Sequence, residues 1–184
     1  MTTVTSKEGR VADAPTAAGR AANLPLRKRP IDIFFIVMFS LFSLTCIISD
    51  AIPTLGIPQT ATTTNILAQW NYTYSSQYDP LYMHEPLWLR FITGTSAFVY
   101  LPFYILLIVC LAKGFNWIQL FSVIYATMII SLTAIPIFGV EFFGPVGERT
   151  PNPLVFLLYN GPYVLVPLLL LIRMRKPMPF TRRF

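Results

Sequence analysis

The sequence carries little charge. Asp, Glu, Lys and Arg together make up 12% of its 184 residues, about half the share that is usual in soluble domains. Hydrophobic residues make up 54%. So few charged side chains cannot give a chain of this length the surface of a soluble protein, and the composition therefore favours a membrane protein.

Signatures of metal and cofactor binding are also lacking. The chain has one histidine, His84, and two cysteines, Cys46 and Cys110, so it offers no multi-histidine metal site and no visible disulfide framework. Both cysteines lie in apolar segments, where we expect them to pack as small apolar residues. No glycine-rich phosphate loop or nucleophile motif occurs. We therefore expect no metal and no cofactor.

Long uncharged runs are the most prominent feature of the sequence. They cover residues 33–49, 91–112, 114–140 and 150–172, which are 17, 22, 27 and 23 residues long. At a rise of about 1.5 Å per residue, roughly 20 apolar residues cross the 30 Å core of a bilayer. Backbone groups in lipid must bond internally, so each run is predicted to be a helix. The sequence therefore predicts an all-α membrane protein, a four-transmembrane-helix bundle.

The basic residues are unevenly distributed. Of 14 Lys and Arg, six precede the first run, one (Lys113) lies between the second and third, and five follow the fourth; only Arg90 and Arg149 remain. The positive-inside rule then places both termini in the cytosol and the long loop between helices 1 and 2 in the lumen. Because topology explains the net charge of +6, we expect no nucleic-acid partner.

Composition also divides the chain. Residues 1–29 are rich in Ala, Thr, Gly and Arg without apolar periodicity and are interpreted as a disordered basic cytosolic tail. Residues 30–176 form the predicted membrane domain, and residues 177–184 a short basic cytosolic tail. In the membrane domain we expect the third helix to end near Phe138, and residues 139–153 to form a second luminal connection.

Asp50 is the main candidate for a functional side chain, because it ends the first apolar run. Two interpretations stay open. It is either a solvated acid at a helix end, or a carboxylate in a partly dry pocket that pairs with a donor or a cation. Asp79 precedes Pro80, and such Asp side chains readily bond nearby backbone donors. We expect Asp79 to order the loop over Asp50, and Glu85 to favour the positive end of the second helix.

Hydroxyl groups and prolines recur in the other helices. Tyr100, Thr133 and Tyr163 are expected at the level of Asp50, where they could give an apolar cavity a few polar groups. Pro102, Pro136 and Pro162 free backbone carbonyls in their helices. They are either ordinary kinks, or they bow the helices open around a pocket.

Asn71-Tyr72-Thr73 fits the acceptor pattern for N-glycosylation. Asn71 is thus a glycosylation candidate if its loop is luminal, although short acceptor patterns are common by chance.

An ordered set of motifs runs through the membrane domain and carries a family resemblance. The motifs are Ile48-Ser49-Asp50, Tyr78-Asp79-Pro80-Leu81, Glu85-Pro86 with Trp88, Tyr100-Leu101-Pro102-Phe103, Ala112-Lys113-Gly114 with Trp117, Thr133-Ala134-Ile135-Pro136, and Pro162-Tyr163 with Pro167. Over about Ile31 to Lys176, the chain resembles the sigma-2 receptor (transmembrane protein 97) family of the EXPERA superfamily, which also holds emopamil-binding protein.

The resemblance implies a four-helix protein of the endoplasmic reticulum membrane, with a buried pocket for sterols and cationic amphiphiles. It implies that Asp50 pairs with a ligand amine or hydroxyl, that Asp79 fixes the loop, and that Tyr100, Thr133 and Tyr163 line the cavity. It also implies a homodimer and a role in sterol homeostasis or trafficking.

One position departs from the family. Ser96 stands where the sigma-2 receptor has a glutamate in its second helix. A second acid would compete with Asp50 for a proton, so the serine is expected to change the binding of amines while remaining part of the site.

Three functions are consistent with these observations. The first is a membrane receptor that binds sterols, related lipids or cationic amphiphiles. The second is an EXPERA-type sterol or terpenoid isomerase or cyclase with Asp50 as general acid. We disfavour it, because an isomerase needs both an acid and a base and the chain lacks the helix histidine and glutamates of that branch. The third is a chaperone-like membrane partner without a ligand.

Overall fold

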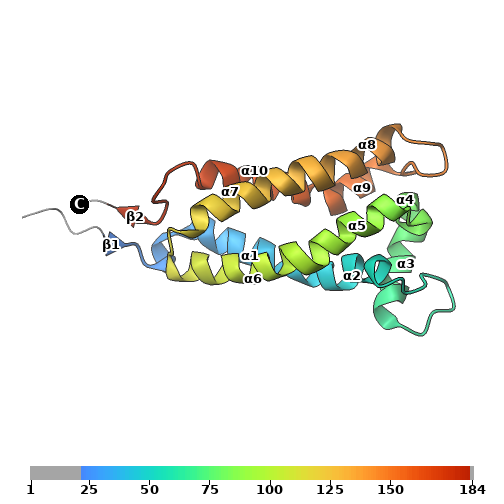
Figure 1. The fold of residues 1–184 in the computed structure, drawn as a ribbon, viewed down its shortest axis with the longest axis horizontal. Helices are drawn as coiled ribbons and strands as arrows, with labels where there is room; N and C mark the ends of the chain where they lie inside the picture. The colour runs from blue at the N-terminus through green and yellow to red at the C-terminus, as the bar shows by residue number, and fades with distance from the viewer. Residues whose placement is uncertain (1–21, 183–184) are drawn as a thin grey trace, which may run out of the picture.

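The structure is a computed structural model that describes residues 22–182. Apart from one two-residue strand pairing it is helical, and its helices lie lengthwise beside one another (Figure 1). The first apolar helix consists of α1 (Pro30–Thr45), the π-helical segment η2 (Cys46–Asp50) and α2 (Ala51–Thr54). The second consists of α5 (Leu87–Thr95), π-helical η3 (Ser96–Tyr100) and α6 (Leu101–Lys113).

The third apolar helix consists of α7 (Ile118–Met128), π-helical η4 (Ile129–Ala134) and α8 (Ile135–Phe143). Two further helices, α9 (Pro153–Asn160) and α10 (Pro162–Arg173), meet at an angle of 41°. Between the first and second apolar helices lie α3 (Ile66–Tyr78) and α4 (Pro80–His84). A 3-10 turn, η1 (Leu26–Lys28), comes after strand β1 (Ala22–Asn23), which pairs antiparallel with β2 (Thr181–Arg182).

Three continuous helices, of 25, 27 and 26 residues, are long and apolar enough to cross a membrane. The bent pair α9 and α10 makes a fourth span if it crosses as one. The prediction of an all-helical membrane protein is thereby confirmed. The predicted end of the third helix near Phe138 was wrong, because the helix continues through Gly139 to Phe143. A single glycine costs a helix only about 1 kcal/mol, and Glu141 consequently lies inside this helix.

The three π-helical segments share one cause. Proline has no backbone N–H, and its ring displaces the carbonyl four residues earlier. For Pro53, Pro102 and Pro136 those carbonyls belong to Ser49, Phe98 and Leu132, which lie within η2, η3 and η4 respectively. In the fourth helix pair, Gly161-Pro162 marks the bend. All four long helical elements are therefore disturbed by proline.

An aromatic core fills the bundle away from these disturbed segments. Phe39 of α1 packs against Tyr104 of α6 and Tyr125 of α7, with ring centroids 5.3 and 5.8 Å apart. The Tyr125 hydroxyl donates to the Tyr104 hydroxyl at 3.1 Å, so these buried phenols satisfy each other. Around the outside, large apolar side chains such as Val37 and Leu41 remain exposed, as expected for surfaces that face lipid.

A buried ionic cluster closes the end of the bundle at which β1 and β2 lie (Figure 1). The Asp32 carboxylate, which is 0% exposed, accepts hydrogen bonds from Arg29 at 2.8 Å and from Arg173 at 2.8 and 3.0 Å. Both guanidinium groups also lie over the Phe180 ring, 5.2 and 5.0 Å from its centroid. Asp32 thus ties the first helix to the last one.

This packed unit reaches beyond the predicted membrane domain of residues 30–176. Arg29 and Phe180 come from the segments that the sequence assigns to tails 1–29 and 177–184, and both are buried. Residues 1–21 and 183–184 of those tails lie outside the described residues. The predicted disorder of the first tail therefore stays a prediction.

Replacing Asp32 tests the cluster. In Asp32→Asn two guanidinium groups lose the charge that balances them, and breaking a buried ion pair costs about 3–5 kcal/mol. We expect a clearly lower melting temperature in detergent. The control is Lys176→Gln, at an exposed position without an ion pair among residues 22–182, which should melt like the wild type. Equal melting of both variants would contradict the role of Asp32.

Candidate functional site

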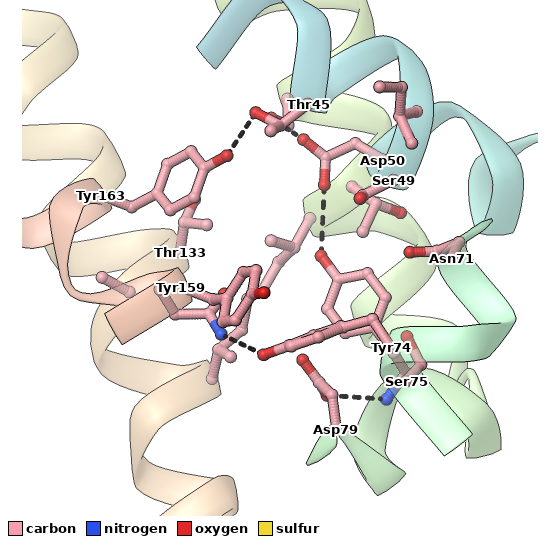
Figure 2. A pocket seen from close by; sticks show the side chains of 18 of the residues that line it. Thr45, Ser49, Asp50, Asn71, Tyr74, Ser75, Asp79, Thr133, Tyr159 and Tyr163 are labelled. Carbon is pink, nitrogen blue, oxygen red and sulfur yellow. Dashed lines mark hydrogen bonds between the residues drawn. The ribbon is translucent and has the colours of Figure 1, made fainter. Parts of the chain in front are cut away.

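A cavity of about 290 Å³ lies at the opposite end of the bundle from the Asp32 cluster, beneath α3 and α4 (Figure 2). Most of its lining surface is apolar, as is usual for small-molecule sites, although many of the lining residues also carry a hydroxyl, amide or carboxyl group. Its lining residues are Thr45, Ile48, Ser49, Asp50, Trp70, Asn71, Tyr74, Ser75, Asp79, Tyr82, Ile92, Thr93, Ser96, Ile129, Thr133, Ala134, Ile137, Phe138, Tyr159, Asn160 and Tyr163.

The proline-disturbed segments form much of this lining. Asp50 comes from η2, Ser96 from η3 and Thr133 from η4, while Asn160 and Tyr163 flank the bend between α9 and α10. A π-helical turn inserts extra backbone into a helix, and such turns are frequent at functional sites. The geometry agrees with the interpretation that the prolines open the helices around a pocket.

The Asp50 carboxylate faces the cavity (Figure 2). Its helix continues for four residues to Thr54, so Asp50 is not at a helix end. Its Oδ2 accepts a hydrogen bond from the Ser96 hydroxyl at 2.5 Å, and its Oδ1 accepts one from the Tyr82 hydroxyl at 3.2 Å. Among residues 22–182, no Lys or Arg forms an ion pair with it. The geometry thus matches the pocket interpretation, with neutral donors only.

Asp79 lines the same cavity and caps α4. Its Oδ1 accepts a hydrogen bond from the backbone N–H of Tyr82 at 3.2 Å, and the residue is 2% exposed. Burial raises the pKa of Asp79, while hydrogen bonding with Glu141 and with the Tyr82 N–H opposes that rise. This position suits the loop-ordering role that the sequence predicts.

Tyr82 joins the two acids, and no pattern in the sequence singles it out. Its backbone contacts Asp79 and its phenol contacts Asp50. Burial, followed by the negative charges of Asp50 and Asp79, raises the pKa of Tyr82 well above its ordinary value. The phenol therefore stays neutral and can donate to Asp50 throughout the physiological pH range.

The remaining predicted side chains divide into two groups. Ser96, Thr133 and Tyr163 line the cavity as expected, and Tyr163 shares a hydrogen bond with Thr45 (Figure 2). Tyr100 does not line it. Its ring packs edge-on against the ring of Tyr125, with centroids 5.4 Å apart, and its hydroxyl lies 3.5 Å from that of Thr133.

Asn71 and Glu85 belong to one polar chain that holds the long loop. The Asn71 amide donates to Gln59, the Gln59 amide donates to Glu85, and Arg90 forms an ion pair with Glu85 at 2.9 Å. Glu85 ends α4 in a left-handed conformation with φ 42°. Asn71 is 4% exposed, and its glycosylation stays a prediction.

Glu141 is a second residue that the sequence patterns did not single out. It is 0% exposed, one helical turn beyond Ile137, which lines the cavity. The signal was the i, i+4 spacing of these two residues, which matters only if the helix extends past Gly139. Within residues 22–182, no three His, Cys, Asp or Glu side chains gather as a metal site would require.

Comparison with protein families identifies a match over residues 66–174. The family described as EXPERA (EXPanded EBP superfamily) matches residues 66–174, which is more than half of the chain. The matched region runs from α3 through α10, whereas Asp50 and the first apolar helix precede it. The comparison with curated proteins returns no match.

Replacing Ser96 tests the contact with Asp50. Ser96→Ala removes the hydroxyl that donates to the carboxylate, and hydrogen bonds between membrane helices contribute about 1 kcal/mol. We expect stability in detergent to fall by roughly that amount. Ser49→Ala is the control, because the Ser49 hydroxyl lines the same cavity without a hydrogen bond to any described residue. Equal stability of the two variants would show that the contact is unimportant.

Proposed function

The chain belongs to the EXPERA family, and from that premise we propose that it is a membrane receptor of the sigma-2 type. Its ligand is a sterol or related lipid, or a cationic amphiphile, held in the cavity beside Asp50. Apolar walls bury the body of the ligand, and Asp50 binds its polar head together with hydroxyl groups such as those of Ser96 and Tyr163.

One observation carries this proposal. The Asp50 carboxylate faces a cavity among apolar helices and has only neutral donors. A charged group in such surroundings favours a counter-charge, because the low dielectric strengthens the attraction. A ligand ammonium group provides that charge, and a sterol hydroxyl provides a weaker hydrogen bond. The position of Asp50 thus favours a polar-headed amphiphile over a purely apolar ligand.

The size of the cavity supports a lipid or amphiphile that is only partly enclosed. Ligand pockets usually measure about 300–1,000 Å³, and this cavity, at about 290 Å³, lies near the lower limit. We infer that it holds the head and the adjoining part of the ligand, while the remainder extends into the bilayer.

The distribution of basic residues supports one orientation of the chain across the membrane. Lys113 precedes Gly114, which bonds to Asn23 of β1, and Arg173 pairs with Asp32, whereas Arg90 pairs with Glu85 at the end of α4. The strands β1 and β2 and the helix α4 lie at opposite ends of the bundle (Figure 1). With twelve of the 14 basic residues assigned to the first side, we infer cytosolic termini and a luminal cavity end. Residence in the endoplasmic reticulum, homodimer formation and a role in sterol homeostasis or trafficking complete the proposal by analogy with the sigma-2 receptor.

An enzymatic function has one observation in its favour. Asp79 lines the same cavity as Asp50, so an acid and a base could both reach a substrate there. An EXPERA-type isomerase or cyclase with Asp50 as general acid is therefore the second candidate. Conversion of a sterol or terpenoid by the purified protein, lost in Asp50→Asn, would establish it in place of the receptor.

The receptor proposal is tested by Asp50→Asn. Binding of a radiolabelled amine amphiphile should weaken about 10- to 100-fold, because a hydrogen bond to a charged group contributes roughly 1.5–3 kcal/mol. Cholesterol, with only a neutral hydroxyl, should lose less than about tenfold. The control is Glu148→Gln, an acid outside the cavity. Unchanged amine binding in Asp50→Asn, with the fold intact, would overturn the proposal.

A further inference from the structure

Glu141 is a buried acid whose carboxyl group has no cation beside it among the described residues. It is 0% exposed, and no N–H or hydroxyl group of the described residues donates to either of its carboxyl oxygens. The ion pairs of residues 22–182 do not include it. An ionised carboxylate in such a place costs several kcal/mol, so a buried acid of this kind holds its proton.

Asp79 is the acid that faces Glu141. Two ionised carboxylates repel each other and cannot form a hydrogen bond. When one of the two groups is protonated, it can donate a hydrogen bond to the other. Asp79 already accepts the Tyr82 backbone N–H at 3.2 Å, which favours its ionised form. No described N–H or hydroxyl group donates to the Glu141 carboxyl group, so Glu141 is the member that carries the proton and donates it to Asp79.

The segments on either side of the pair are also joined. The Thr150 backbone N–H donates to the Glu141 carbonyl at 3.1 Å, and the Thr150 hydroxyl donates to the Tyr78 carbonyl at 2.8 Å. Tyr78 directly precedes Asp79. The pair therefore lies where the cap made by α3 and α4 meets the end of α8.

A short path leads from this pair to the ligand site. Asp79 caps α4, α4 carries Tyr82, and the Tyr82 phenol donates to Asp50 at 3.2 Å. Because α4 has only five residues, a change at its first turn reaches the Tyr82 side chain directly.

We propose that Glu141 is a positioning residue for the ligand site: as a neutral acid it donates to Asp79, fixes α4, and so keeps the Tyr82 phenol on Asp50. The inference rests on the proposed function of the cavity for its effect on binding, but the shared proton itself does not depend on a ligand.

The surroundings determine the direction of the pH effect. The titratable groups that face the pair are the phenols of Tyr74 from α3 and Tyr82 from α4, both neutral at physiological pH. Arg149, the nearest cation in sequence, donates to the Gly144 carbonyl. The folded chain holds a proton that an unfolded glutamate releases above about pH 4.3. Stability from the pair is therefore complete at low pH and is lost as pH rises.

Two substitutions of Glu141 distinguish the loss of its hydrogen-bond donor from the loss of its ability to titrate. Glu141→Gln keeps an N–H donor toward Asp79 but cannot lose it with pH, whereas Glu141→Ala removes the donor. The probe is tritiated dodecyltrimethylammonium, because its charge does not change with pH. We expect Glu141→Gln to bind it within about twofold of the wild type at pH 5.5, and Glu141→Ala to bind it about tenfold more weakly.

The pH dependence of the melting temperature distinguishes a shared proton from a purely structural role of Glu141. Between pH 5.5 and 8.5 the melting temperature of the wild type should fall relative to that of Glu141→Gln. Tyr82→Phe should weaken probe binding about three- to tenfold yet keep the wild-type pH dependence of melting, because it leaves the acid pair intact.

The outcomes are distinguishable. A wild type that binds no probe refutes the proposed function, and the melting profiles then still decide whether Glu141 holds the proton. Parallel melting profiles of the wild type and Glu141→Gln would overturn the shared proton. Wild-type probe binding by a folded Glu141→Ala would overturn the positioning role.

Discussion

The need to satisfy backbone groups within lipid shapes this protein more than any single contact. A proline removes one donor from its helix and displaces the carbonyl four residues earlier. Pro53, Pro102 and Pro136 each follow a π-helical segment by two or three residues, and Pro162 lies at the bend of 41° in the last helix pair. These disturbed segments gather around one cavity. Away from the cavity, buried aromatic side chains fill much of the bundle.

Two acids near opposite ends of the first helix, Asp32 and Asp50, have different partners. Asp32 meets two guanidinium groups and is fully buried. Asp50, near the other end, meets only hydroxyl groups and faces a cavity. The first arrangement balances charge inside the protein and stabilises the fold. The second leaves a negative charge that a ligand can balance, which is why Asp50 rather than Asp32 belongs to the proposed site.

The cap over the cavity is held by polar contacts in addition to an apolar cluster, in which Leu81 of α4 packs with Leu89, Ile137 and Phe156. Asp79 begins α4, Glu85 ends it, and Asn160 of the last helix pair donates to Tyr74 of α3 at 3.0 Å. Polar contacts of this kind respond to protonation and to ligands more readily than packed apolar side chains do. The cap and the ligand site therefore form one polar system, with Tyr82 in contact with both acids.

The sequence by itself determined the apolar helices, the prolines within them, and the candidacy of Asp50 and Asp79, because hydropathy and turn chemistry are local properties. It did not determine which side chains meet. Asp32 and Arg173 lie 141 positions apart, and Tyr100 faces the aromatic core although Thr133 and Tyr163 face the cavity. Helix phase changes by about 100° for each residue, so every π-helical turn re-aims the side chains beyond it. Only the tertiary structure could therefore bring Tyr82 to Asp50 and bury Glu141 opposite Asp79.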